Sequence, residues 1–153
     1  QHLGSQGNKP PALFSYRANG QTVRDGVEQT KPVTVNFGGV TVTYSWNATL
    51  NGWLRRQNGT IHRDHLGQSV APGNVIIQLT HYDQSPTYPY TPTPRLIGEG
   101  EVWVLTEGQV VTGRWSRVNA EAITTYRATD GNEIRLTPGR TWVAFARAGT
   151  VAR

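Results

Sequence analysis

The chain has 153 residues, no cysteine and a formal net charge of +5. This length is typical of one domain with its own buried core, and the lack of cysteine excludes disulfides and thiolate metal sites. The positive charge suits acidic partners, but the arginines are scattered rather than clustered on one element, which does not favour nucleic-acid binding. No apolar run approaches the length of a transmembrane segment.

Residues 1–10 (QHLGSQGNKP) are polar and contain glycine and proline, a composition typical of a linker or tail. We expect residues 11–153 to form a single domain. Because the chain does not begin with methionine, we also expect it to be a processed or excised part of a longer protein.

Turn dipeptides and short alternating runs organise the rest of the chain. Asn-Gly and Asp-Gly pairs, which favour tight hairpin turns, occur at 19–20, 25–26, 51–52, 58–59 and 130–131. Apolar and polar residues alternate from Val40 to Trp46, whereas Asn74–Tyr82 begins with apolar residues on both faces, as a central strand would. No window has the apolar period of a helix. The sequence predicts an all-β domain, a sandwich or partly closed barrel of roughly nine to eleven short antiparallel strands.

The expected core consists of the inward-facing apolar residues of these runs: Val42, Tyr44, Trp46, Val75, Ile77, Val102, Val104, Ile134 and Val143. Trp103 and Trp142 are also expected in the core, because a sandwich of this size needs bulky inward side chains. Trp53, which lies close to Arg55 in sequence, is instead expected at the surface. An exposed Trp and Arg on a β-surface suit sugar or peptide ligands, so both are candidate binding residues.

The segment TIHRDHL holds His62, Asp64 and His65, the residue types that bind zinc and other divalent ions. On a strand, positions 62 and 64 face one side and 65 faces the other, so a site with three ligands would need a turn there. We expect these residues to make ordinary hydrogen bonds and to hold no metal. They remain weak candidates for the metal site of a hydrolase.

Asp83–Pro94 (DQSPTYPYTPTP) contains four prolines, and proline cannot donate to a strand ladder. The sequence therefore predicts an extended, semi-rigid surface loop. Tyr88 and Tyr90, with Arg95 beside them, are candidate contact residues, because rigid aromatic side chains bind at low entropic cost. The alternative is that both tyrosines lie flat and cover the edge of the sandwich.

Gly98-Glu99-Gly100 resembles the start of a phosphate-binding loop, but no third glycine or helix follows at the required spacing. Two β-rich runs around Glu107-Gly108 predict a hairpin instead, with the glycines at a bulge or a close backbone approach. Glu99 and Glu101 share a strand face, as paired hydrolase carboxylates would, yet solvated edge charges explain them better. Ser116 lacks the G-x-S-x-G context of a nucleophile.

A series of short motifs occurs in a fixed order: Tyr44–Trp46, Gly52–Arg55, Asn58–Gly59, His62–Asp64, Asn74–Gln78, Gly98–Val104, Gly113–Arg117 and Leu136–Trp142. With this series, about residues 11–147 resemble the C-terminal domain of the YerB-like bacterial lipoproteins, a domain of unknown function. The resemblance implies an exported, envelope-facing location, a lipid-anchored N-terminal segment and a separate N-terminal domain. It implies no established activity.

These observations favour a non-catalytic binding or structural module of the cell envelope, with no cofactor. The expected location is extracytoplasmic, either secreted or anchored through a segment absent from this chain. A cell-wall polymer or a separate N-terminal domain is the expected partner. The alternative is a hydrolase that acts on envelope polymers, with or without a metal.

Overall fold

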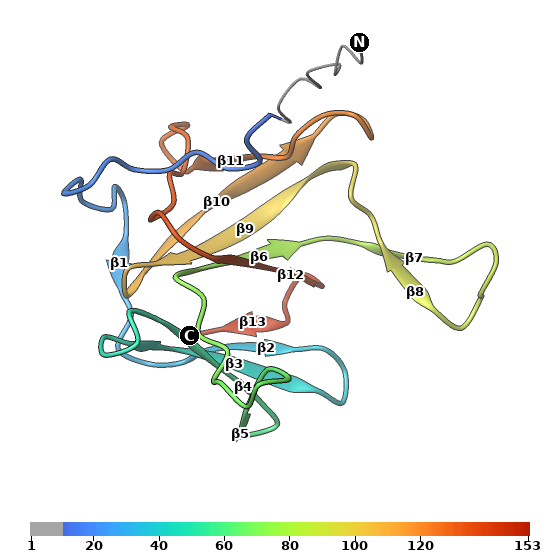
Figure 1. The fold of residues 1–153 in the computed structure, drawn as a ribbon. Coiled ribbons are helices and arrows are strands. Elements are labelled where there is room, and N and C mark those ends of the chain that lie inside the picture. The colour runs from blue at the N-terminus through green and yellow to red at the C-terminus, as the bar shows by residue number, and fades with distance from the viewer. Residues whose placement is uncertain (1–10) are drawn as a thin grey trace, which may run out of the picture.

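A computed structural model describes residues 11–153, so the polar tail expected at residues 1–10 lies outside the described part. The described residues form thirteen strands and no helix, which confirms the all-β prediction (Figure 1). A bilayer-spanning helix is accordingly absent from residues 11–153. Several strands are only two residues long, which explains why more strands are present than the sequence patterns predicted.

Six strands form the large sheet: β1 (Val27–Glu28), β6 (Asn74–Leu79), β9 (Gly98–Thr106), β10 (Gln109–Arg117), β11 (Thr125–Ala128) and β12 (Thr141–Ala146). Their order is β1-β10-β9-β6-β12, and β11 also pairs with β10. The β6–β12 pair is parallel and all other pairs are antiparallel. The predicted central strand is therefore β6, between β9 and β12.

Five strands form the small sheet, in the order β13 (Val151–Ala152), β2 (Val33–Asn36), β3 (Thr41–Asn47), β4 (Gly52–Gln57) and β5 (Thr60–Ile61). The two sheets pack face to face and neither closes on itself. Of the two predicted architectures, the sandwich is confirmed.

The large sheet is covered on both faces. Its inner face packs against the small sheet through a core that includes Tyr44, Trp53 and Ile77. Its outer face is covered by the N-terminal segment, residues 11–26, and by the chain around β11. The apolar residues between them form a second core, the outer core, which includes Trp115 and Ile134. Because β6 lies under both cores, all six of its residues are buried. Most of the expected core is buried, but Trp46, Trp103, Trp142 and Val143 are only half-buried.

The predicted hairpin at residues 98–117 is β9–β10, and Glu107 and Gly108 turn it with φ of 50° and 75°. Gly100 lies opposite Trp115, whose indole N–H donates to the Leu79 carbonyl at 2.7 Å. A Cβ on Gly100 would stand 2.5 Å from that carbonyl oxygen and 2.7 Å from the indole nitrogen. The glycine motif therefore permits a close approach of the backbone to Trp115.

Gly100→Ala is expected to lower the free energy of unfolding by about 2 kcal/mol, because backbone and indole must both shift to admit the methyl group. Urea denaturation followed by tryptophan fluorescence measures the change. Gly73→Ala is the matched control, since the nearest atom to a Cβ there is 3.8 Å away. Equal effects of the two substitutions would show that the contact at Gly100 is not the cause.

The proline-rich segment forms a two-stranded arm rather than a simple loop. Strands β7 (Tyr82–Gln84) and β8 (Pro92–Pro94) pair antiparallel and project away from both sheets (Figure 1). The backbone N–H of Arg95 donates to the His81 carbonyl. Because hydrogen-bonded and non-hydrogen-bonded pairs alternate in an antiparallel ladder, Pro92 and Pro94 occupy positions whose N–H would not point toward β7. The prolines are compatible with this short hairpin for that reason, which the sequence prediction overlooked.

Candidate binding site

The tip of the arm carries the two tyrosines expected to contact a partner. Tyr88 is 67% exposed and Tyr90 is 97% exposed, so neither lies flat against the sandwich. The base of the arm is fixed, because the Tyr82 hydroxyl donates to the Phe145 carbonyl at 2.8 Å and the Arg147 guanidinium lies 4.7 Å from the centre of the Tyr82 ring. The arm therefore presents aromatic side chains on an anchored support.

Arg95 belongs to the arm but is occupied by it. Its Nε and Nη2 atoms bind the two carboxylate oxygens of Asp83 at 3.1 and 2.8 Å, and this contact lowers the pKa of Asp83. Both side chains are more than half exposed, so the pair adds little stability. The pair joins β7 to the residue that follows β8, so Arg95 contacts the base of the arm and is not free beside the tyrosines.

The expectation that Trp53 and Arg55 are exposed is wrong. Trp53 is fully buried and Arg55 is 9% exposed. The chain after β5 covers the edge of strand β4. The backbone N–H of Trp53 donates to the Pro72 carbonyl, and the backbone N–H of Arg55 donates to the Val70 carbonyl. Both side chains then point into the sandwich, where Trp53 packs 5.5 Å from Trp46.

Arg55 is a buried cation in an aromatic environment. Its guanidinium lies 5.1 Å from the centre of the Trp142 ring, and Nη1 is 2.7 Å from Nδ1 of His62. Burial raises the pKa of Tyr44, and the nearby Arg55 opposes that rise. Gln57 is a distant acceptor at 3.4 Å, while Arg55 Nε is buried without a hydrogen-bond partner. The ion pairs within residues 11–153 join Arg17 to Glu107, Arg95 to Asp83 and Arg114 to Glu99, so Arg55 has no acidic partner there.

The weak metal candidates have separate roles. His62 contacts Arg55 and stands edge-on to Trp142. Asp64 Oδ1 accepts hydrogen bonds from the backbone of Leu66 and Gln68, both at 2.9 Å, and His65 is exposed. In the described part of the chain, no group of three or more His, Asp or Glu residues has the arrangement of a metal site.

The two carboxylates considered for a hydrolase are also engaged. Glu99 pairs with Arg114 at 3.2 Å, and Glu101 accepts the indole N–H of Trp103 at 2.7 Å. The first contact joins β9 to β10, and the second joins two residues of β9. Both carboxylates are exposed, as expected of solvated charges, but they belong to an interior strand of the large sheet and not to an edge strand.

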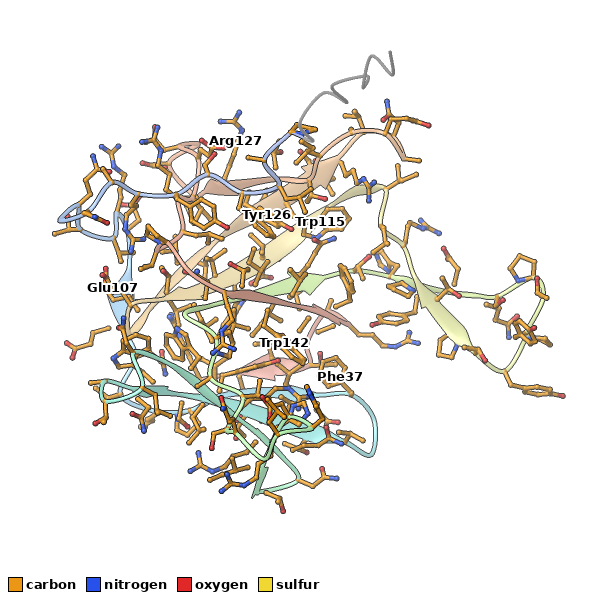
Figure 2. All side chains as sticks on the ribbon, in the orientation of Figure 1. Phe37, Glu107, Trp115, Tyr126, Arg127 and Trp142 are labelled. Atoms are coloured by element: carbon orange, nitrogen blue, oxygen red, sulfur yellow. The ribbon has the colours of Figure 1, made fainter. Side chains whose placement is uncertain are left out.

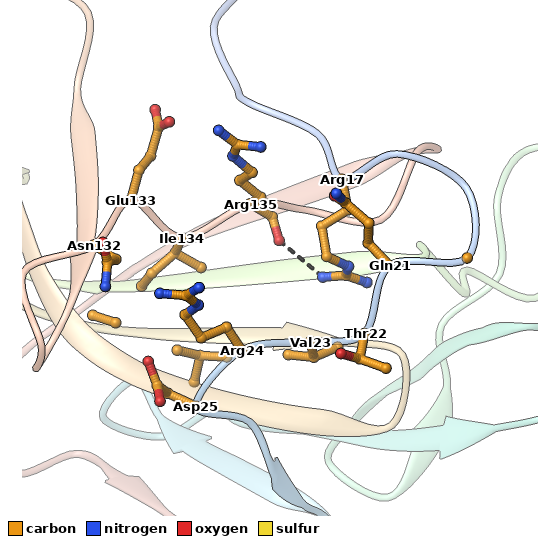
Figure 3. A pocket seen from close by; sticks show the side chains of 13 residues that line it. Arg17, Gln21, Thr22, Val23, Arg24, Asp25, Asn132, Glu133, Ile134 and Arg135 are labelled. Carbon is orange, nitrogen blue, oxygen red and sulfur yellow. Dashed lines mark hydrogen bonds between the residues drawn. The ribbon is translucent and has the colours of Figure 1, made fainter.

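A pocket of about 590 Å³ lies beside the outer core, between the N-terminal segment and the chain after β11 (Figure 3). Its charged residues are of both signs. Arg24 reaches across the pocket near Asp25, while the side chains of Arg135 and Glu133 extend away from it. Arg17 is paired with Glu107, and the two other arginines of the lining are matched by Asp25 and Glu133, so no ligand class is singled out.

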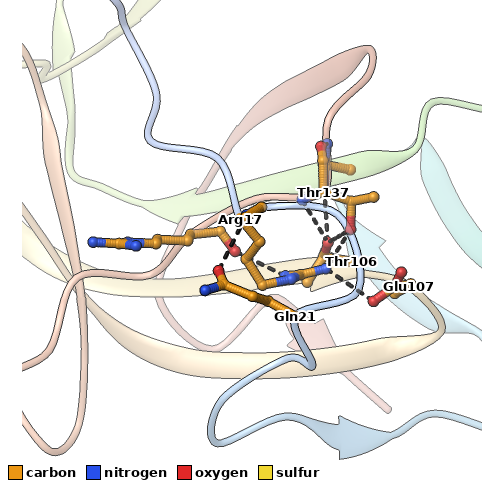
Figure 4. Close-up of polar contacts among 8 residues, drawn as sticks. Arg17, Gln21, Thr106, Glu107 and Thr137 are labelled. Atoms are coloured by element: carbon orange, nitrogen blue, oxygen red, sulfur yellow. Dashed lines mark hydrogen bonds and ion pairs between the residues drawn. The ribbon is translucent and has the colours of Figure 1, made fainter.

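Arg17 is a buried, hydrogen-bonded charged residue that the sequence did not predict (Figure 4). It is buried, and its guanidinium donates to Glu107 and to the Arg135 carbonyl, both at 2.9 Å, and to Thr137 Oγ1 at 2.5 Å. Thr137 joins this group to Thr106. The network ties the N-terminal segment to the β9–β10 turn, which is a structural role.

Comparison with known proteins gives a family and a fold. Residues 33–143 match the family model described as "Protein of unknown function (DUF3048) C-terminal domain". The solved structure of the YerB protein from Bacillus subtilis superposes with a TM-score of 0.69 at 18% sequence identity, over 92% of this chain and 47% of that protein. The chain thus spans about half the length of YerB. No curated protein sequence matches it. The predicted resemblance to a YerB-like C-terminal domain of unknown function is confirmed.

Proposed function

We infer that this chain, which belongs to the DUF3048 C-terminal domain family, is a non-catalytic binding module of an exported, envelope-associated bacterial protein. The observation that carries the inference is the arm. It holds Tyr88 and Tyr90 away from the sandwich, and they are among the most exposed large apolar residues of residues 11–153.

The chemistry of the arm suits a protein partner. Tyrosine offers a large contact area with few rotatable bonds, and Pro89, which lies between the two tyrosines, limits the backbone freedom lost on binding. A projecting hairpin fits a concave protein surface better than it fits a flat polymer. We therefore propose that the arm inserts into a groove of a folded protein domain.

The proposed source of that groove is another part of the full-length protein. YerB, whose fold this chain shares, is about twice as long as the chain. The extracytoplasmic location and a lipid anchor remain part of the proposal. The hydrolase alternative has less support, because all of its candidate residues except the exposed His65 contact loop backbone or neighbouring side chains.

The double substitution Tyr88→Ala/Tyr90→Ala tests this function. We expect it to abolish binding to the rest of the full-length gene product, produced separately, and to leave Tm within a few degrees because both side chains are exposed. Leu66→Ala, at another exposed site, is the control and is expected to bind normally. Affinity is measured by surface plasmon resonance and Tm by calorimetry.

The same variants are also tested for binding to purified cell-wall sacculi. The chain could sediment with sacculi only when Tyr88 and Tyr90 are present and fail to bind the rest of the gene product. That result would show that the arm binds a glycan and would contradict the protein partner. A double variant that binds as before would remove the arm from the function altogether.

A further inference from the structure

Strand β12 has an open edge. It pairs with β6 on one side and with no strand of the described part on the other. The backbone N–H of Asn74 donates to the Arg140 carbonyl, and the backbone N–H of Thr80 donates to the Ala146 carbonyl. In a parallel ladder the backbone groups of alternate residues point to the same side. The backbone N–H and C=O groups of the even-numbered residues of β12 therefore point toward β6, and those of Thr141, Val143 and Phe145 point away from it. Only one outward group has a partner within residues 11–153, the Phe145 carbonyl, which accepts the Tyr82 hydroxyl.

This edge differs from the other sheet edges. Strands β5 and β13 are two residues long, and the chain at Asn132 and Ile134 covers β11 through backbone hydrogen bonds. At six residues, β12 is the longest edge strand of the two sheets described. Its outward N–H and C=O groups have the geometry that accepts another extended chain.

The unpaired cation Arg55 lies behind the same strand. Its guanidinium packs on Trp142 of β12, and His62 stands beside both. Trp142 and His62 are half-buried, so they border the opening of the sandwich along this strand, and Trp142 is seen there between the sheets (Figure 2). A buried cation without an anion is unfavourable, and a ligand carboxylate would supply one.

We propose that the edge of β12 binds an extended acidic peptide by strand addition. The peptide backbone pairs with Thr141 and Val143, and alternate side chains face the sandwich beyond Trp142. A Glu or Asp at one inward position places its carboxylate against Arg55. The backbone bonds supply affinity and Arg55 supplies the selectivity for a negative charge.

Synthetic peptides of about ten residues, long enough to span the edge as a strand, test the proposal. An array of alternating Thr/Val peptides carries one Glu at each position in turn, with a matched Gln series. We expect one Glu position to bind at least about tenfold more tightly than its Gln counterpart. Amide NMR shifts of Thr141, Val143 and Phe145 should then change on titration with the best peptide.

Two variants separate the backbone from the charge. Val143→Pro removes an outward N–H that β6 does not use, and Val143→Ala is its control with the N–H retained. We expect only the proline variant to lose binding. Arg55→Gln should bind the Glu and Gln peptides equally, whereas Arg55→Lys should keep the preference for Glu.

Three results would overturn the proposal: no peptide of the array binds, Val143→Pro binds like Val143→Ala, or Arg55→Gln keeps the preference for Glu. The tyrosine variant of the arm is expected to bind the peptides normally. Failure of this proposal is therefore distinguishable from failure of the proposed function.

Discussion

Replacing Trp115 by alanine is expected to lower the free energy of unfolding by about 3–5 kcal/mol, the usual cost of deleting a buried tryptophan. Trp115 is 2% exposed and belongs to the outer core. The substitution removes that packing and also leaves the buried Leu79 carbonyl without the indole N–H that it accepts. Equilibrium denaturation in urea, followed by circular dichroism, gives the change directly.

Trp115→Phe separates the two contributions. Phenylalanine keeps most of the apolar surface but cannot donate to Leu79, so an intermediate loss of about 1–3 kcal/mol is expected. Trp103→Ala serves as a comparison, because Trp103 is half-buried and should matter less. A Trp115→Ala protein as stable as the Trp103→Ala protein would show that the outer core does not stabilise the fold.

The parts of the fold that were predictable depend on local chemistry. The Asn58-Gly59 turn has positive φ at both residues, as its sequence favours, and the alternation in Val40–Trp46 placed Val42 and Tyr44 in the core. Both signals act over a few residues. They need no knowledge of which strands become neighbours.

The errors arose where distant segments meet. Trp53 and Arg55 are buried because residues 70–72 pair with β4, and nothing close to them in the sequence indicates that pairing. The parallel β6–β12 pair joins strands more than 60 residues apart, so the open edge of β12 was equally hidden. The proline-rich surroundings of Tyr88 and Tyr90 excluded a central strand, but they left open whether the tyrosines lie flat on the sandwich or project into solvent.

The Arg17 network shows the same limit at a single residue. Arg17 and Glu107 are 90 positions apart, and Arg17 lies in a segment with no regular strand pattern. A buried arginine with several acceptors has no local sequence signature. Only the fold brings the N-terminal segment onto the β9–β10 turn.

Arg17→Met is expected to lower the free energy of unfolding by about 2–4 kcal/mol, because hydrogen bonds to a charged group contribute about 1.5–3 kcal/mol each and the loss is partly offset by methionine packing. Arg24→Met and Arg135→Met, which replace exposed arginines of the adjoining pocket, are controls with expected changes of about 0.5 kcal/mol or less. Urea denaturation compares the three variants.

Hydrogen exchange locates the effect within the molecule. If Arg17 fastens the N-terminal segment, Arg17→Met should remove the protection of the Arg17 and Leu136 amides, which donate to the carbonyls of Leu136 and Ser15, while the amides of the small sheet stay protected. Glu107→Gln should have a weaker effect, because the Glu107 side chain is 46% exposed and the amide oxygen still accepts a hydrogen bond. Loss of protection in the small sheet alone would contradict this assignment, since it would place the effect of Arg17 outside the outer core.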